Sequence, residues 1–212
     1  MNPSDTLNTV VDWIFLEIRN PSDSADIIRT ITGLLQRDGD IVDANTGDFP
    51  QIDSLPNSFY LAVRHRNHLG VMTAQPIVEV NDEVCVDFTN MTDAEAYHFG
   101  AYDGLEMATL NGKKALWAGN GFHETRTKYD GSGNDRQKIG ADLLQHDLNI
   151  SSVLNFNLAE GYLFGDINLD GKVKYDGINN DRIWLQNIIL NYPINFNGAQ
   201  LNNFNLMLEQ LP

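Results

Sequence analysis

The sequence predicts a mainly β protein in which an antiparallel β-sandwich precedes two loop–helix units. Three observations carry this prediction. Residues 9–89 consist of short β-branched and aromatic runs separated by turn residues, a spacing typical of an antiparallel sandwich. After Asn90 the chain becomes rich in Asn, Asp and Gly, and it contains two segments with helical spacing. Part of this second region also occurs twice.

The N-terminal part is expected to be an immunoglobulin-like sandwich that ends near residue 90. Asp38-Gly39 supplies the positive φ of a tight hairpin between the second and third strands. Cys85, the sole cysteine, lies in Val84-Cys85-Val86 and is interpreted as a small buried strand residue rather than a nucleophile. The predicted strands cover residues 10–19, 29–36, 40–44, 58–66, 69–73, 77–80 and 83–89.

Residues 91–212 should contain two helices, at 135–145 and 181–191. Their broad apolar faces require a sheet to cover them, so residues 1–90 and 91–212 are expected to form one cooperative unit. Alternation in residues 204–209 predicts an edge strand that pairs with the sandwich. The apolar faces consist of Ile139, Leu143 and Leu144 in the first helix and Leu185, Ile188 and Ile189 in the second.

Composition excludes several classes of function. Lys and Arg number 14 against 29 Asp and Glu, a formal charge of -15, which repels nucleic-acid phosphates and anionic lipids. No apolar run reaches the length of a membrane span, so membrane insertion is not expected. Surplus carboxylates on a folded body favour a cation as the partner.

The most specific signal is an internal repeat. Residues 120–136 align without a gap with residues 166–182, an offset of 46 residues. Within this alignment the motif Lys-Tyr-Asp-Gly-x-x-Asn-Asp-Arg matches at every fixed position, and it ends at the start of each predicted helix. The repeat therefore predicts two copies of one loop–helix unit.

The second copy has the ligand types of a calcium loop. Asp166, Asn168 and Asp170 occupy positions one, three and five, Gly171 permits a sharp turn at six, and Lys172 offers its carbonyl at seven. Six to eight oxygen ligands suit Ca²⁺, whereas Mg²⁺ retains more water. No cluster of thiolates or histidines in the sequence supports zinc.

The acid that closes this loop is not fixed by spacing, because position twelve is Gly177. The alternatives are Asp176 and Asp181. Asp181 is favoured because it begins a helix, where its carboxylate meets free backbone N–H groups, with residues 174–180 as an enlarged loop. A turn rich in Asn, Asp and Gly that binds no metal is the competing interpretation.

The first copy is a poorer cage. Phe122 replaces Asn168, and Thr125 takes the position of Gly171, so a ligand and the easy turn are lost. Calcium affinity should therefore be higher in the second copy. The remaining candidate ligands of the first copy are Asn120, Glu124, the Arg126 carbonyl and Asp135.

Asp-x-Asn-x-Asp-Gly-x-Val followed by an acid and an amphipathic helix, present twice, resembles the duplicated calcium repeat of dockerin modules. The enlarged form around Val173-Lys174-Tyr175, with Val11-Asp12-Trp13 and the closing Gln210-Leu211-Pro212, resembles the C-terminal region of large secreted or surface proteins of Bacteroidetes. The resemblance implies an exported, calcium-stabilised C-terminal module of a larger protein, with no enzyme activity.

Two classes of function compete. A non-catalytic structural or attachment module is preferred, because no nucleophile–base order, phosphate-binding Gly loop or close carboxylate pair is visible. The alternative is a module that recognises a glycan or a cell-surface protein, for which Ile183, Trp184 and Ile189 would supply exposed apolar positions. His65 and His68 would point to opposite faces of a strand, which disfavours a zinc site in segment 64–68. An anion or sugar contact is the other alternative there, and a solvated or salt-bridged strand edge is preferred.

Overall fold

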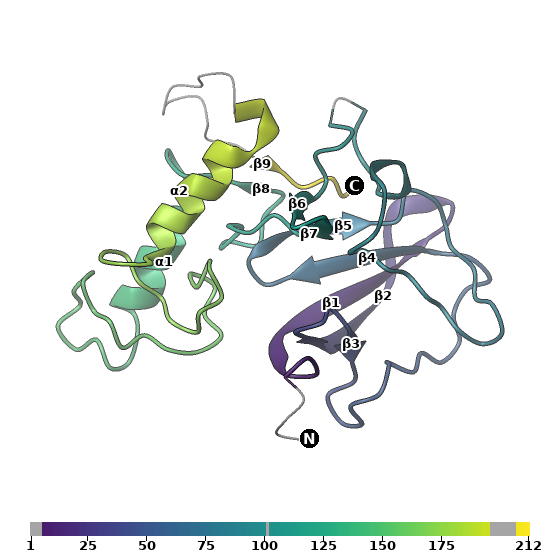
Figure 1. Ribbon diagram of the computed structural model, residues 1–212, viewed down its shortest axis with the longest axis horizontal. Coiled ribbons are helices and arrows are strands. Elements are labelled where there is room, and N and C mark those ends of the chain that lie inside the picture. The colour runs from purple at the N-terminus through teal and green to yellow at the C-terminus, as the bar shows by residue number, and fades with distance from the viewer. Residues whose placement is uncertain (1–5, 101, 196–206) are drawn as a thin grey trace. The chain divides into compact units, whose positions relative to one another are not determined.

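The computed structural model describes residues 6–100, 102–195 and 207–212 (Figure 1). The chain is mainly β, and it divides into two compact units. Unit 1 comprises residues 1–65, 70–115 and 210–212, and unit 2 comprises residues 66–69 and 116–209. The main division thus falls between residues 115 and 116, whereas the sequence suggests one near residue 90. Residues 66–69, which comprise the turn between two strands and the first two residues of the second strand, belong to unit 2.

A five-stranded antiparallel sheet forms the body of unit 1, in the order β3-β2-β1-β4-β5. The central strand β1 pairs with β2 on one side and with β4 on the other. Gly39, with φ of +101°, makes the predicted hairpin between β2 and β3. The strands are β1 (Val10–Asn20), β2 (Asp23–Gln36), β3 (Ile41–Val42), β4 (Tyr60–His65) and β5 (His68–Met72).

Strand β1 buries the face that carries an aspartate. Ile14, Leu16 and Ile18 are buried there, and so is Asp12. The carboxylate of Asp12 lies 3.2 Å from Nε2 of His65 on the neighbouring strand β4, which offsets the cost of burying the acid. His65 is therefore a buried partner of an acid on an inner strand: it has the charged partner that the prediction allowed, but it lies neither at a sheet edge nor in solvent.

Several predicted strand positions are wrong. Strand β2 begins at Asp23, six residues before the predicted start. Segments 77–80 and 83–89 are not strands; Ile77 bridges to Phe59, and Val80 bridges to Glu83. Cys85 is exposed rather than buried. β-branched content alone does not make a strand where no partner strand is available to pair with it.

Unit 1 also contains a small hairpin that the sequence prediction missed. Strands β6 (Ala108–Leu110) and β7 (Lys113–Ala115) pair in antiparallel fashion. Their turn is Asn111-Gly112, with φ of 52° and 79°. Asn-Gly between two short strands is the pattern of a two-residue hairpin, so the signal was present in the sequence. A short 3-10 helix, η1 (Asp93–Glu95), precedes this hairpin.

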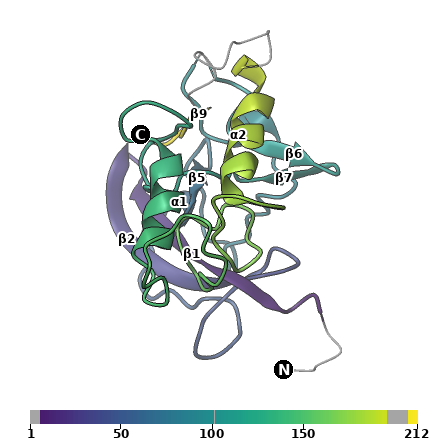
Figure 2. The ribbon, with the colours of Figure 1, turned by 90° about the vertical axis from the view of Figure 1, so that its left-hand side faces the viewer.

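Unit 2 is built around helices α1 (Asp135–Leu144) and α2 (Asp181–Asn191), which lie side by side (Figures 1 and 2). Both helices confirm their predictions, although α1 ends one residue early. Of the predicted apolar faces, Leu144 is exposed and Ile188 only half-buried. The positions that are buried are Ile139 and Leu143 in α1 and Leu185 and Ile189 in α2.

Strand β9 (Met207–Leu208) pairs with β8 (Arg126–Thr127), and both belong to unit 2. The prediction that the C-terminal strand pairs with the sandwich is therefore wrong for these two residues. Residues 204–206 of the predicted strand lie outside the described part of the chain. A second 3-10 helix, η2 (Pro193–Asn195), follows α2.

The loop of each repeat packs against the helix of the other repeat, and an equivalent glycine lies at each of the two contacts. A Cβ on Gly119 would lie 2.8 Å from Cδ1 of Leu185 in α2, and a Cβ on Gly165 would lie 2.8 Å from Cα of Ile139 in α1. Gly119 and Gly165 differ by the repeat offset, as do Ile139 and Leu185. Each loop therefore begins against the helix of the other copy, and glycine is required at both contacts.

Candidate functional site

In loop 2 (residues 166–181), Asp181 ties the two ends of the loop together. Its Oδ1 accepts hydrogen bonds from the backbone N–H of Ile167 at 2.8 Å and of Asn168 at 3.3 Å. Its Oδ2 accepts from Lys174 N at 2.7 Å, and its own N–H donates to the Lys174 carbonyl at 2.9 Å. One carboxylate thus fixes the backbone at both sides of the loop, an arrangement that we call the clasp.

Loop 1 (residues 120–135) has the same clasp. Oδ1 of Asp135 accepts from Phe122 N at 3.2 Å, and Oδ2 accepts from Lys128 N at 2.7 Å. The Asp135 N–H donates to the Lys128 carbonyl at 2.9 Å. Asp181 was expected to accept from the N–H groups of its own helix; instead, the carboxylates of Asp181 and Asp135 both accept from the backbone of their loops.

The other fixed residues of the repeated motif also have structural roles. Asn180 caps α2 by accepting from Ile183 N at 2.9 Å, and its amide donates to the Gly177 carbonyl at 2.6 Å. Arg182 pairs with Asp176 at 3.0 Å, so this exposed acid points to the arginine while Asp181 lies within the loop. The first copy makes the matching contacts with Asn134, Gln137, Gly131, Arg136 and Asp130.

Burial strongly affects the two clasp carboxylates. Asp181 is 0% exposed, and burial, with the charge of Asp166 as a further cause, raises its pKa to about 7. Burial likewise raises the pKa of Asp135 to about 6, with a contribution from the charge of Glu124. Backbone N–H donors oppose both shifts without cancelling them. A cation beside loop 2 would favour the ionised form of its carboxylates.

The ligand positions of loop 2 turn their oxygens into the loop. Oδ1 of Asp166 at 3.1 Å and Oδ1 of Asn168 at 2.9 Å both accept from the N–H of Asp170. Oδ2 of Asp166 accepts from Gly171 N at 3.1 Å, and Gly171 has φ of +83°. Oδ1 of Asp170 accepts from Lys172 N at 3.0 Å. The donor set consists of hard oxygens, which is the ligand type that Ca²⁺ prefers.

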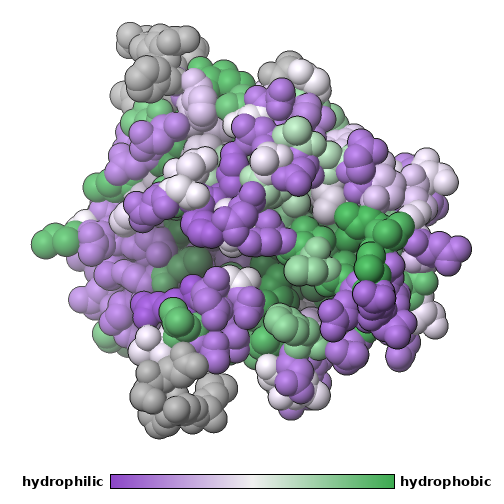
Figure 3. All heavy atoms as spheres, turned by 45° about the vertical axis from the view of Figure 1, so that its right-hand side comes forward, coloured by the Kyte–Doolittle hydropathy of each residue, from purple (hydrophilic) through white to green (hydrophobic). Residues whose placement is uncertain are grey.

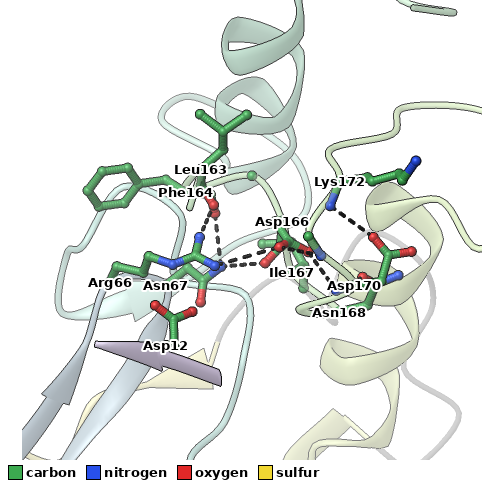
Figure 4. A network of polar contacts seen from close by, with 12 residues as sticks. Asp12, Arg66, Asn67, Leu163, Phe164, Asp166, Ile167, Asn168, Asp170 and Lys172 are labelled. Atoms are coloured by element: carbon green, nitrogen blue, oxygen red, sulfur yellow. Dashed lines mark hydrogen bonds and ion pairs between the residues drawn. The ribbon is translucent and has the colours of Figure 1, made fainter. Parts of the chain in front are cut away.

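The start of loop 2 is held by two residues that the sequence prediction missed. The buried guanidinium of Arg66 donates to the Leu163 carbonyl and lies 3.6 Å from Oδ2 of Asp166 (Figure 4). The amide of Asn67 donates to the carbonyls of Phe164 at 3.1 Å and Asp166 at 2.6 Å. Arg66 partly offsets the effect of burial on the pKa of Asp166, which is nevertheless raised.

Asn67 also holds the start of loop 1. Its backbone carbonyl accepts from Gly119 N and Asn120 N, both at 2.9 Å. One residue therefore contacts equivalent positions of the two repeats. Both Arg66 and Asn67 are buried, so the solvated alternative for this segment is wrong for them, whereas the ion pair between Arg66 and Asp166 agrees with the salt-bridged alternative. They lie about 100 residues from loop 2, and no local pattern in the sequence pairs such distant segments.

The first turn of loop 1 is held by the side-chain amide of Asn120. Oδ1 of the buried Asn120 accepts from Glu124 N at 2.8 Å, and its Nδ2 donates to the Glu124 carbonyl at 2.5 Å. The half-exposed carboxylate of Glu124 points toward Arg126, at 3.9 Å. Aspartate at position 120 could not donate the second bond, because an ionised carboxylate only accepts. Asn120 thus satisfies both the N–H and the carbonyl of Glu124 with its own amide.

The residues of loop 2 fit a calcium ion in chemistry, with one constraint. Oδ1 of Asp181 accepts two N–H groups and Oδ2 accepts one, so one lone pair stays open and Asp181 can contribute a single ligand atom. The carboxylates of Asp166, Asp170 and Asp181 are not mutually within 4.8 Å. Among the described residues, His98, Asp103 and Glu106 form the three-residue group that meets this distance.

Comparisons with protein-family models, with curated proteins and with solved structures found no match. Within the described ranges, neither helix is long and apolar enough to cross a membrane.

Proposed function

We propose that this chain is a non-catalytic, calcium-binding structural or attachment module, and that loop 2 holds the ion. The observation that carries the proposal is that the side-chain oxygens of Asp166, Asn168 and Asp170 turn into the same loop that the buried clasp of Asp181 ties together. The side-chain oxygens of Asp166 and Asn168 both accept from the N–H of Asp170, and the buried Asp181 has a raised pKa. An ion bound there would add positive charge beside Asp166 and Asp170, whose cationic neighbours are Arg66 at 3.6 Å and Lys174 at 3.4 Å.

The ion would stabilise the fold by mass action. If only the folded chain binds, free calcium at about 100 times the dissociation constant adds roughly 2.7 kcal/mol to the free energy of unfolding. Arg66, Asn67 and the clasp determine where the loop lies, so the chain's own residues position the oxygens. The Lys172 carbonyl completes the proposed ligand set.

The assignment to a family is part of the same proposal. The duplicated loop–helix arrangement supports a likeness to dockerin repeats, and the antiparallel sheet supports a likeness to an immunoglobulin-like sandwich. By that likeness the chain is the C-terminal module of a secreted or cell-surface protein.

Calorimetry of the intact chain with Ca²⁺ tests the proposal. We expect one strong site, which the double substitution Asp166→Ala and Asp170→Ala removes. Asp176→Asn is the matched control, because it changes an acid of the same loop that faces Arg182. Absence of calcium heat in the parent, or equal affinity in the double variant, contradicts the proposal.

A second candidate function, recognition of a glycan or protein, is favoured by the outer face of α2. Ile183 and Trp184 are each 45% exposed, whereas Ile189, the third residue predicted there, is buried. Apolar side chains also reach the surface elsewhere, as the face in Figure 3 shows. A glycan array with the intact chain should then give signals that Trp184→Ala removes; identical arrays would exclude this role for the tryptophan.

A further inference from the structure

A cluster in unit 1, outside both loops, brings together three residues able to bind a metal. One ligand atom from each of His98, Asp103 and Glu106 lies within 4.8 Å of the others. Nδ1 of His98 is 3.5 Å from Oε1 of Glu106 and 4.0 Å from Oδ1 of Asp103. These residues come from the segment 94–114, for which the sequence suggests no role.

The backbone on both sides of the cluster is fixed. Tyr97 N donates to the Met72 carbonyl at the end of β5, and Phe99 N donates to the side chain of the buried Gln210. Glu106 lies two residues before β6, and its Oε1 accepts from Gly104 N at 3.0 Å. His98 and Glu106 are therefore positioned by the unit's own framework.

The cluster has more acceptors than its histidine can satisfy. Three oxygens lie within 4.0 Å of Nδ1 of His98, namely those of Glu106, Asp103 and the Ala96 carbonyl at 3.3 Å. A single N–H bonds well to one acceptor at a time, so an ion pair between His98 and Glu106 leaves two oxygens without that donor. A metal ion contacts all of its ligands together.

The distances also suit a small ion. With metal–ligand bonds of about 2.0–2.2 Å, two ligands of a tetrahedral site lie roughly 3.3–3.6 Å apart. The separation of 3.5 Å between His98 and Glu106 falls in that range. Asp103 is slightly farther, but its side chain is 68% exposed and can turn inward, while that of Glu106 is 1% exposed.

We propose that His98, Asp103 and Glu106 form a second metal site, which takes Zn²⁺. An imidazole with two carboxylates suits zinc, whereas Ca²⁺ prefers oxygen ligands throughout. Three protein ligands leave the fourth tetrahedral position for water. This site shares no residue with loop 2.

The test is calorimetric titration of the full chain with Zn²⁺ in saturating Ca²⁺, which occupies loop 2 if it binds there. We expect one equivalent of zinc. His98→Ala should weaken it by at least about 100-fold, since loss of a direct ligand exceeds the 10- to 100-fold effect of outer-shell changes. His146→Ala is the matched control and should bind zinc like the parent.

A change at a less exposed ligand could disturb folding. Asp103→Asn avoids this difficulty, because the side chain of Asp103 is exposed. We expect zinc affinity to fall by at least about 10-fold there, with unchanged circular dichroism, because the substitution does not remove the side-chain oxygen but replaces a charged ligand by a weaker, neutral amide oxygen. The Asp166→Ala and Asp170→Ala double variant should retain zinc even if it loses calcium. No zinc binding by the parent, parental affinity in His98→Ala, or loss of zinc in the double variant overturns the proposal.

Discussion

Loop 1 and loop 2 share a backbone arrangement and differ in the side chains at their first positions. Both have the clasp, the asparagine cap and the arginine–aspartate pair at an offset of 46 residues. In loop 1 Asn120 bonds to both the N–H and the carbonyl of Glu124, so side-chain hydrogen bonds close the loop. In loop 2 Asp166 can only accept. The repeated motif therefore specifies the shape of the loop, and under the proposed function the variable positions before it decide which loop binds an ion.

The largest effect should come from removing a clasp. Asp181→Ala and Asp135→Ala leave three and two backbone N–H groups, respectively, without their acceptor, at about 1–3 kcal/mol for each group that is shielded from water. We expect each variant to lose about 3–5 kcal/mol of unfolding free energy in chelator, measured by urea unfolding. When calcium replaces the chelator, the loss of unfolding free energy should become larger for Asp181→Ala and stay the same for Asp135→Ala.

If calcium left the losses of the two clasp variants equal, the loops would not differ in their need for an ion. Exposed Asp147→Ala provides the control for general effects of removing an acid.

A reciprocal exchange at the first ligand position sharpens the comparison. Asp166→Asn should reduce calcium affinity by at least about 10-fold, because a charged ligand becomes neutral. Asn120→Asp should cost about 2 kcal/mol in chelator, since a buried carboxylate replaces the donor to the Glu124 carbonyl. Calorimetry and urea unfolding measure the two effects. Unchanged values in both variants would show that this position does not distinguish the loops.

The pH dependence of stability should separate the two clasps. Each acid has a folded pKa above the unfolded value of 3.8, so in this range the folded chain holds a proton that the unfolded chain has lost. Stability without calcium therefore falls as pH rises, up to about 6 for Asp135 and about 7 for Asp181. One proton accounts for at most about 1.4 kcal/mol per pH unit.

Urea unfolding in chelator at pH 5, 6 and 7 measures this decline. Between pH 6 and 7 it should be clearly smaller in Asp181→Asn than in Asp135→Asn, because Asp135 has lost most of its proton in this range while Asp181 is still titrating. Saturating calcium should also reduce it, because the ion keeps the carboxylate of Asp181 charged. A decline of the same size in Asp181→Asn would remove this acid as its source.

The smallest effect concerns the arginine of each repeat. Arg182 stacks over Tyr175 at 5.2 Å, and Arg136 stacks over Tyr129 at 5.0 Å. Both arginines are partly exposed, so Arg→Ala at either position should cost only about 0.5–1 kcal/mol in thermal unfolding. Because these contacts are the same in both copies, the two losses should agree; a large difference would indicate that the shared scaffold is not equivalent.

Local patterns predicted much of this structure. The spacing of Leu185 and Ile189 predicted α2, Asp38-Gly39 predicted a hairpin, and the repeat at Asp135 and Asp181 predicted both loops. The features that these local patterns did not predict depend on contacts between residues that are far apart in the sequence. The burial of Arg66 and Asn67 requires the carbonyls of Leu163, Phe164 and Asp166, and nothing near residue 66 specifies them. Asp181 was predicted as a ligand from its position, but its hydrogen bonds to the loop backbone follow only from the folded geometry.

Amide chemical shifts measured while calcium is added test the central claim most directly. With uniformly ¹⁵N-labelled intact chain, we expect the amides of Asp170 and Gly171, which donate to the carboxylate of Asp166, to shift and saturate at one equivalent. The amide of Glu124, which donates to Asn120, should stay unchanged over the same range. Equal shifts in both loops, or shifts confined to loop 1, would contradict the account.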